Sequence, residues 1–389
     1  MYNKLLMFSF YSLILNAFFR PLNSSIAAIF GYITILLAFL YPIVRSRYNG
    51  KMLIGRIPFA FVCILLLSMV SSVGYFTTNG IDNQIIAIIS FITLYWSLSF
   101  KQRNTNTANV VYIQDLCKAN YILCAVLLLF GFGPFSFKYM VVDVWGNKVF
   151  SMGLGNPNVV SVYVMFAIVL LLIDLVSQTR TIFRIIDLLI VASLFYLLIL
   201  LSSRTVVACV LLLMLGYIIG KRSNKMQFLW WLVIAWPLVM IFFTLILGER
   251  SIALQLLGKA LETGRYSMYT TTITDIKEFP LSFVFGQVFR YRFSNMHNAP
   301  LTIITNIGVV GLIVYLVFWY SEIKKLNDCC ESKVQRIAFY AMLAFIIQSS
   351  SESLSMVGTI PYAIMVIIID KTANGEIVDR NSFTPQGEN

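Results

Sequence analysis

The chain has 389 residues, of which 59% are hydrophobic and only 12% are charged, and its formal net charge is +12. A water-soluble globule of this length could not bury so large an apolar fraction, so we expect lipid to be the solvent for most of the chain. The Lys and Arg residues fall in short connections between apolar runs, which is typical of membrane topology and not of nucleic-acid binding.

Apolar runs of roughly twenty residues recur along the chain, and a helix of that length crosses a hydrocarbon layer of ~30 Å. The first run lacks the small-residue cleavage site of a signal peptide, so we interpret it as a retained anchor. The sequence predicts an all-α, polytopic inner-membrane protein with a single integral membrane domain, residues 1–389. In chain order, the pattern predicts about twelve membrane-spanning helices, at 5–19, 25–44, 57–75, 82–100, 119–134, 157–177, 185–203, 205–220, 227–247, 300–320, 336–354 and 358–370.

The distribution of basic residues predicts that both termini lie in the cytoplasm, because most of the 29 Lys and Arg residues then fall on that side. On this topology residues 248–299 form a large periplasmic loop, and residues 372–389 form a flexible cytoplasmic tail. A basic loop on the outer face suggests an anionic ligand such as a lipid phosphate or pyrophosphate, although some of its basic side chains could simply reach lipid headgroups. The basic residues of the loop are Arg250, Lys259, Arg265, Lys277, Arg290 and Arg292.

Two short helices are predicted within this loop. Apolar residues between Ile252 and Leu261 recur at helical spacing and predict an amphipathic helix on the membrane surface. A second helix is predicted over about 266–278, because apolar residues recur at helical spacing there and Pro280 cannot continue a helix. Arg265 would then lie between the two helices.

His297, the only histidine, precedes a helix that is predicted to start near Ala299 and Pro300. The helix dipole and the neighbouring cations would favour a neutral imidazole, which can accept a proton and act as a general base. The alternative is an interfacial histidine that bonds to a backbone group.

Arg204 follows two serines at the outer end of a predicted span, where an arginine is costly unless it is paired or used. Together with Arg265 it could hold a diphosphate, because the planar guanidinium group makes paired bonds to phosphate oxygens. The alternative is a pairing of Arg204 with a carboxylate such as Glu262 or Glu352. In the segment Gly-Asn-Pro-Asn, Asn156 and Asn158 could bind sugar hydroxyls, but capping of the following helix is the simpler interpretation of these residues taken alone.

These motifs together resemble one family. His297-Asn298 followed by Gly308 and Gly311 is similar to the signature of the bacterial O-antigen ligase and polymerase superfamily, in which a histidine at the start of a late span precedes Gly-x-x-Gly. The Gly-Asn-Pro-Asn segment at 155–158, Ser-Arg-Thr at 203–205 and Gly-Arg-x-x-x-Tyr at 264–269 also resemble that superfamily. The resemblance implies a GT-C-like fold and a metal-independent glycosyltransferase without a cofactor, which uses undecaprenyl-diphosphate-linked oligosaccharides at the periplasmic face of the bacterial inner membrane.

With this resemblance, His297, Arg265 and Arg204 are the expected catalytic residues. The arginines would hold the diphosphate leaving group and His297 would deprotonate the acceptor hydroxyl, without a metal, because the outer loops offer no cluster of acidic and histidine ligands. The residues expected to contact the substrate are Arg290, Arg292, Asn298, Asn156, Asn158, Tyr266 and Tyr269.

The motifs favour a Wzy-type polymerase of O-antigen or capsule repeat units, because the Gly-Asn-Pro-Asn and Gly-Arg-Tyr segments look more like polymerases. The first alternative is a WaaL-type ligase, which transfers the polymer to lipid A–core. The second is a polysaccharide flippase or transporter, which is less favoured because the predicted spans hold few ionisable residues, with Asp174 and Asp187 near cytoplasmic ends. Expected partners are the lipid-linked oligosaccharide and membrane lipid, with a chain-length regulator protein as a further candidate, and no nucleic acid.

Overall fold

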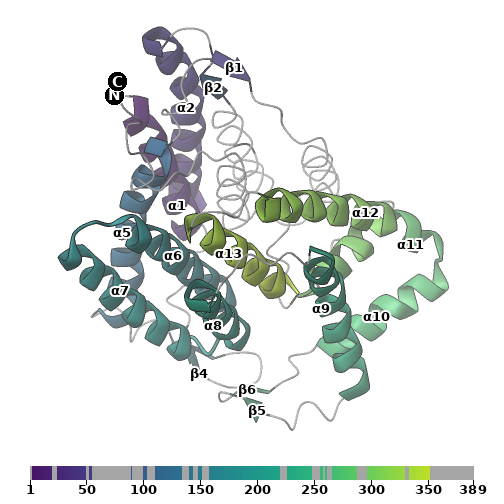
Figure 1. Cartoon of the computed structure of the whole chain (residues 1–389). Helices are drawn as coiled ribbons and strands as arrows, with labels where there is room; N and C mark the ends of the chain where they lie inside the picture. Colours follow the sequence, from purple (N-terminus) through teal and green to yellow (C-terminus); the bar gives the residue numbers. More distant parts are fainter. Residues whose placement is uncertain are drawn as a thin grey trace.

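The structure, a computed structural model, has an α-helical architecture (Figure 1). Within the described part of the chain it has eleven helices and three short pairs of strands. The residues that it describes are 2–19, 24–49, 52–54, 89, 100–102, 110–133, 140–142, 148–150, 157–219, 226–247, 255–256, 259–260, 265–286, 296–328 and 333–350.

Nine of the described helices overlap predicted spans, and the remaining two, α10 and α11, lie within the large loop 248–299. The predicted spans 57–75, 82–100 and 358–370 and the tail 372–389 lie outside the described residues, apart from positions 89 and 100. The helices are α1 (Tyr2–Phe19), α2 (Ser24–Asn49), α5 (Val110–Phe132), α6 (Pro157–Ser177), α7 (Thr181–Leu200), α8 (Arg204–Ile219), α9 (Met226–Leu247), α10 (Arg265–Glu278), α11 (Leu281–Phe285), α12 (Ala299–Asp328) and α13 (Lys333–Ser349).

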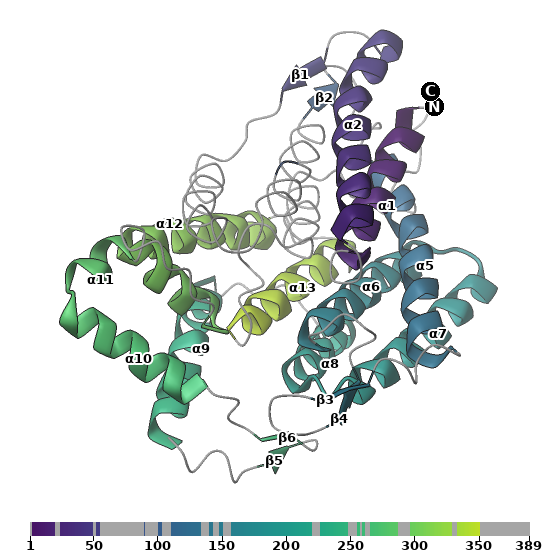
Figure 2. The ribbon, with the colours of Figure 1, turned by 180° about the vertical axis from the view of Figure 1, so that it is seen from behind.

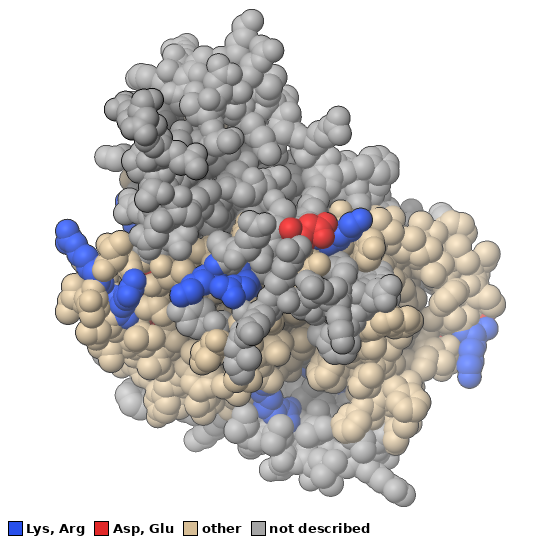
Figure 3. All heavy atoms as spheres, viewed as in Figure 1, with Lys and Arg blue, Asp and Glu red and all other residues tan. Residues whose placement is uncertain are grey.

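Three of the described helical segments are long and apolar enough to cross a membrane: Ser25–Val44, Thr181–Leu200 and Ala299–Ser321. Large apolar side chains face outward from the helices; Leu189 on α7 is 63% exposed and Phe242 on α9 is 66% exposed. On the face shown in Figure 3, most of the described surface is uncharged and the visible basic side chains stand at separate places. Several long apolar helices with outward-facing hydrophobic side chains indicate a multi-pass membrane protein.

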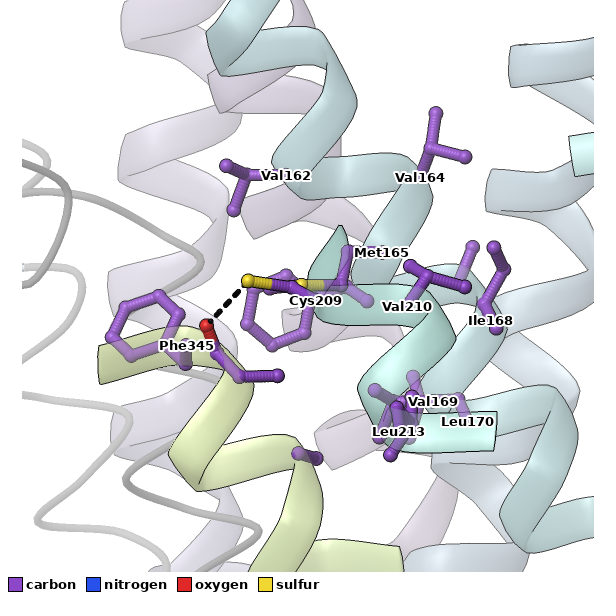
Figure 4. Packing of buried hydrophobic residues seen from close by; sticks show 14 of the residues in the cluster. Val162, Val164, Met165, Ile168, Val169, Leu170, Cys209, Val210, Leu213 and Phe345 are labelled. Carbon is purple, nitrogen blue, oxygen red and sulfur yellow. Dashed lines mark hydrogen bonds between the residues drawn. The ribbon is translucent and has the colours of Figure 1, made fainter. Parts of the chain in front are cut away.

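Helix α13 lies between two groups of helices. Figures 1 and 2 show α5 to α8 on one side of it and α9 to α12 on the other. It packs closely on α8, where the thiol of Cys209 donates a hydrogen bond to the backbone oxygen of Ala344 at 3.1 Å (Figure 4). Further along the pair, Gly216 of α8 lies against the ring of Tyr340. Because residue numbers rise on α8 as they fall on α13, the two helices are antiparallel.

The apolar core is built mainly from α6, with α8 and α13 packed against it. Buried residues run along most of α6 from Val160 to Ile173, so this helix is apolar on all sides and is enclosed by its neighbours. Figure 4 shows its side chains meeting Val210 and Leu213 of α8 and Phe345 of α13. The core thereby fixes the start of α6, the start of α8 and the end of α13 relative to one another.

The three strand pairs are antiparallel: β1 (Met52–Ile54) with β2 (Phe100–Gln102), β3 (Met140–Val142) with β4 (Lys148–Phe150), and β5 (Gln255–Leu256) with β6 (Lys259–Ala260). The last pair shows that the predicted amphipathic helix between Ile252 and Leu261 is wrong. Gly258 lies between the paired strands in the sequence; a glycine disfavours a helix interior by about 1 kcal/mol and suits a tight hairpin turn. The second predicted helix of this loop is confirmed as α10.

Candidate functional site

Arg204 is the first residue of α8, and an unusual backbone conformation precedes it. After α7 ends, Ser202 adopts a left-handed conformation with φ of 51°, and Ser203 and the next helix follow directly. A non-glycine residue in this conformation is uncommon and is held by its surroundings. The reversal of the chain between two packed helices places Arg204 half-buried at the boundary of an apolar segment.

Arg265, the first residue of α10, lies near Arg204. Burial lowers the pKa of Arg204, and the positive charge of Arg265 lowers this pKa further. Such an effect needs a short separation between the two guanidinium groups, since charges screened by water interact weakly. Arg265 is itself half-buried, and its Nε atom is removed from solvent. The fold thus brings two cations from distant parts of the sequence into one partly buried place, where one anion could bond to both guanidinium groups.

Asn158 belongs to a polar network that adjoins Arg204. The hydroxyl of Ser161 donates to the backbone oxygen of Asn158 at 2.7 Å and lies 2.8 Å from the Oγ atom of Ser203. Ser203 Oγ in turn lies 3.5 Å from Asn158 Oδ1. These contacts tie the first turn of α6 to the residue before Arg204. The Gly-Asn-Pro-Asn and Ser-Arg-Thr motifs, which are far apart in the sequence, therefore meet in space.

His297 immediately precedes the start of α12 and also has a left-handed backbone, with φ of 49°. Its neighbour Met296 is buried and is fixed on two sides: its backbone N–H donates to Thr302 Oγ1 at 3.1 Å, and its sulfur accepts the hydroxyl of Thr272 at 3.2 Å. Because Thr272 lies on α10, the helix that begins with Arg265 packs directly against the segment that carries His297. His297 itself is partly exposed.

Asn298 occupies a different place from the one predicted for a substrate ligand. It is 0% exposed, and its Oδ1 atom accepts the backbone N–H of Leu301 at 3.1 Å, which caps α12. Its Nδ2 atom donates to the backbone oxygens of Ser350 at 3.0 Å and Pro237 at 3.4 Å. Both ends of the amide are thus used within the protein, so the structure supports a positioning role for Asn298 beside His297.

The basic residues and the histidine lie at the same end of the described helices. Because α8 and α13 are antiparallel, with Cys209 opposite Ala344, Arg204 at the start of α8 lies level with Ser350 at the end of α13. Ser350 bonds to Asn298, the neighbour of His297. With Arg265 near Arg204, the three residues predicted to be catalytic come from α8, α10 and the segment before α12 and gather at one end of the bundle.

Two glycines hold the loop helices against α12. Gly308, with φ of 81°, interrupts α12, and a Cβ atom at this position would overlap the backbone of Val284. Gly286, with φ of 66°, follows α11, and a Cβ atom there would overlap the backbone of Asn306 and Ile307. Glycine is required at both positions because backbone meets backbone and because both conformations are left-handed. The first glycine of the Gly-x-x-Gly motif therefore serves to dock α11 onto α12.

Of the other residues predicted to contact the substrate, the structure describes the two tyrosines of α10. Tyr269 of α10 is only 2% exposed, whereas Tyr266 of the same helix is half-buried. Arg290, Arg292 and Asn156 lie outside the described residues. Among the residues that the structure does describe, no group of three His, Cys, Asp or Glu side chains is placed to hold a metal ion.

The structure also adds residues to the site that were not predicted from the sequence. Ser161 bonds to Asn158 and to Ser203, and Thr272 bonds to Met296, the neighbour of His297. Ser161 follows Asn158 by three residues, a spacing that places two side chains on one face of a helix and could have indicated the contact. No comparable pattern marks Thr272, since it lies among other threonines of α10.

No protein-family model matches the chain, and no curated protein sequence matches it. A function for the chain is therefore inferred from its motif residues and their placement.

Proposed function

We propose that this protein is a Wzy-type polymerase of O-antigen or capsule repeat units. It transfers a glycan from undecaprenyl diphosphate to the end of another lipid-linked repeat at the periplasmic face of the bacterial inner membrane, without a metal or cofactor. The observation that carries the proposal is the approach of Arg204 and Arg265 at the end of the bundle where His297 lies. It agrees with the roles that the motifs imply for these three residues.

In the proposed reaction the acceptor hydroxyl oxygen attacks the anomeric carbon of the donor glycan. The bond from that carbon to the diphosphate oxygen breaks, and the leaving diphosphate keeps the electron pair. Arg204 and Arg265 hold this diphosphate, and their charge stabilises the negative charge that develops on it. His297 takes the proton of the acceptor hydroxyl, a role for which a neutral imidazole is suited.

The placement of the two arginines and of the segment before α12 supports this assignment. The positive charge of Arg265 acts on Arg204, so a diphosphate that bridges the two guanidinium groups gains charge-assisted bonds to both. Arg265 starts α10 and Met296 contacts the same helix through Thr272, so one short helix connects the anion site to the histidine. Half-buried Tyr266, next to Arg265, and Asn158 near Ser203 are the remaining described candidates for glycan contacts.

The test is polymerisation by the purified, full-length protein with a lipid-linked repeat unit. His297→Ala is expected to lose about 10²–10⁴-fold in rate, the usual contribution of a general base. Arg265→Lys keeps the charge but not the planar fork, and is expected to lose about 10-fold or more. Arg184→Lys is the matched control; Arg184 bonds to Gln178 near the opposite end of α7 and should retain full activity. Long polymer from His297→Ala would remove the proposed base.

Two alternatives are separated by other measurements. For a flippase or transporter, the specific observation is a partly buried group in which Tyr121 bonds to both Asp174 and Asp187, since carboxylates within membrane helices are typical of transport pathways. Chain elongation in detergent, where there is no second compartment, excludes transport as the primary activity. A deletion strain addresses the ligase: loss of a polymerase leaves single repeat units on lipid A–core, whereas loss of a ligase leaves core without them.

A further inference from the structure

Three helices meet at one phenol oxygen, at the end of α7 opposite to Arg204. Tyr121 of α5 places its hydroxyl oxygen 2.7 Å from Oδ2 of Asp174 on α6 and 2.6 Å from Oδ1 of Asp187 on α7. From Asp187 to the end of α7 the helix rises by ~20 Å, so this group lies far from Arg204, which follows the end of α7. Gln178 adds an amide contact to Asp174 Oδ2 at 3.3 Å.

The number of protons that the three side chains share determines which of them are charged. In water at neutral pH, one tyrosine and two aspartates hold a single proton among them, on the phenol. Oxygen–oxygen distances of 2.6 and 2.7 Å are those of full O–H···O hydrogen bonds, and each such bond needs its own proton. One phenol proton supplies one of the two bonds. The second bond requires an additional proton on a carboxyl group, which then donates to the phenol oxygen.

The surroundings place this additional proton on Asp187. Asp187 is 0% exposed, and its Oδ2 atom is buried and makes no hydrogen bond. A charged carboxylate with a bare, buried oxygen is far more costly than a neutral acid in the same place. Asp174 is only partly buried and accepts bonds from both Tyr121 and the Gln178 amide, so it is the better position for the negative charge.

We propose that Tyr121, Asp174 and Asp187 form a proton-binding site between α5, α6 and α7. Asp187 holds the bound proton as a carboxylic acid and donates to the phenol oxygen, while Tyr121 donates to the ionised Asp174. The chain of bonds is also a relay: the Asp187 O–H bond breaks as the phenol takes that proton, and the phenol O–H bond breaks as Asp174 is protonated. The site binds a proton whether or not the protein is a polymerase.

In the part of the chain that the structure describes, the side-chain hydrogen bonds of Asp174 and Asp187 run to Tyr121 and Gln178, and neither aspartate forms an ion pair there. Among the described residues, the thiols of Cys117 and Cys124 on α5 also interact with the aspartates. These thiols are buried, and burial in apolar surroundings disfavours the thiolate, so they add no charge to the site.

Infrared spectroscopy tests the proposal directly, because a carboxylic acid has a C=O stretching band that a carboxylate lacks. Spectra of the full-length protein in lipid are compared across a pH series for the wild type, Asp187→Asn and Asp174→Asn. The wild type is expected to show one acid band at neutral pH, which Asp187→Asn removes and Asp174→Asn retains. Absence of an acid band at neutral pH overturns the proposal, and so does a band that only Asp174→Asn removes.

Two further measurements cover the case in which an aspartate variant fails to fold. Carbon-13-labelled aspartate in the wild-type protein should shift the acid band, which identifies it as an aspartic acid without any substitution. Tyr121→Phe removes the acceptor of the Asp187 proton while it keeps the ring, so the band should move to higher frequency. If neither the carbon-13 label nor Tyr121→Phe shifts the acid band at neutral pH, the proposed site is contradicted.

Discussion

Gly286 and Gly308 bring two backbone segments into direct contact, each with a positive φ and each without room for a Cβ atom. Gly286 meets the backbone of Asn306 and Ile307 on α12, and Gly308 meets the backbone of Val284 on α11. This paired contact anchors the loop helices to the helix that follows His297. It gives the Gly-x-x-Gly motif a structural explanation that does not depend on any ligand.

Gly308→Ala should therefore be severely destabilising. Gly308 has φ of 81° and ψ of −173°, a conformation that is essentially restricted to glycine and costs about 1–3 kcal/mol for alanine. Overlap with the Val284 carbonyl raises the loss of unfolding free energy to about 3 kcal/mol or more. Gly311→Ala is the matched control: its added Cβ would meet only side-chain atoms of Ile307 and Ile303, so we expect a loss of about 1–2 kcal/mol. Thermal unfolding in detergent measures both, and equal losses would contradict the paired contact.

Asn298 offers a test of capping against substrate binding. Asn298→Ala removes the cap and the bonds to Ser350 and Pro237, with an expected loss of about 2–3 kcal/mol. Asn298→Asp keeps the acceptor for Leu301 N–H but turns an oxygen toward two carbonyl oxygens in a fully buried place. It should be at least as unstable as Asn298→Ala. A stable Asn298→Asp protein with reduced turnover would instead support the predicted substrate contact.

Helix positions were predictable wherever apolar runs end at clear signals. The helix α6 begins at Pro157 and ends at Ser177, as predicted, because proline suits a first helical turn and every side of this helix is apolar. A helix was predicted in place of β5 and β6 because the apolar residues there recur at helical spacing, although Gly258 disfavours a helix interior. The break of α12 at Gly308 was not predicted either, since an uninterrupted apolar run carries no sign of the segment that packs against it.

The sequence indicated which residues are candidates for the site, but it did not indicate which residues contact one another. Arg204 could be chosen because an arginine at the edge of an apolar run is costly, Arg265 because it lies in a basic outer loop, and His297 because it is the only histidine and precedes a predicted helix. The same criteria could not separate Asn298 from a ligand, because its partners Ser350 and Pro237 are distant in the sequence. Asp174 and Asp187 were noted only as few and near the ends of spans, and their meeting at Tyr121 depends on how three helices pack.

The network beside Arg204 predicts energetic coupling between Ser161 and Ser203. Their hydroxyl oxygens are 2.8 Å apart and both residues are buried. Each single change to alanine leaves the other hydroxyl without this partner, whereas the double change removes both groups. We expect the double variant to be less destabilised than the sum of the single variants by about 1 kcal/mol. Thermal unfolding of the four proteins gives this value, and strict additivity would contradict the contact.

Anion binding by Arg204 and Arg265 can be separated from catalysis with inorganic pyrophosphate. A ligand that bridges the two guanidinium groups bonds to both, and it binds only the folded protein, in which the two groups are close. At about 100 times its dissociation constant it should stabilise the fold by about 2.7 kcal/mol, seen as a higher melting temperature.

The shift should be lost in Arg204→Gln and in Arg265→Gln, because one remaining arginine offers half of the contacts. His297→Ala, although inactive, should keep the full shift, since the histidine acts on the acceptor and not on the diphosphate. A shift of equal size with pyrophosphate in all four proteins would show that the anion binds elsewhere.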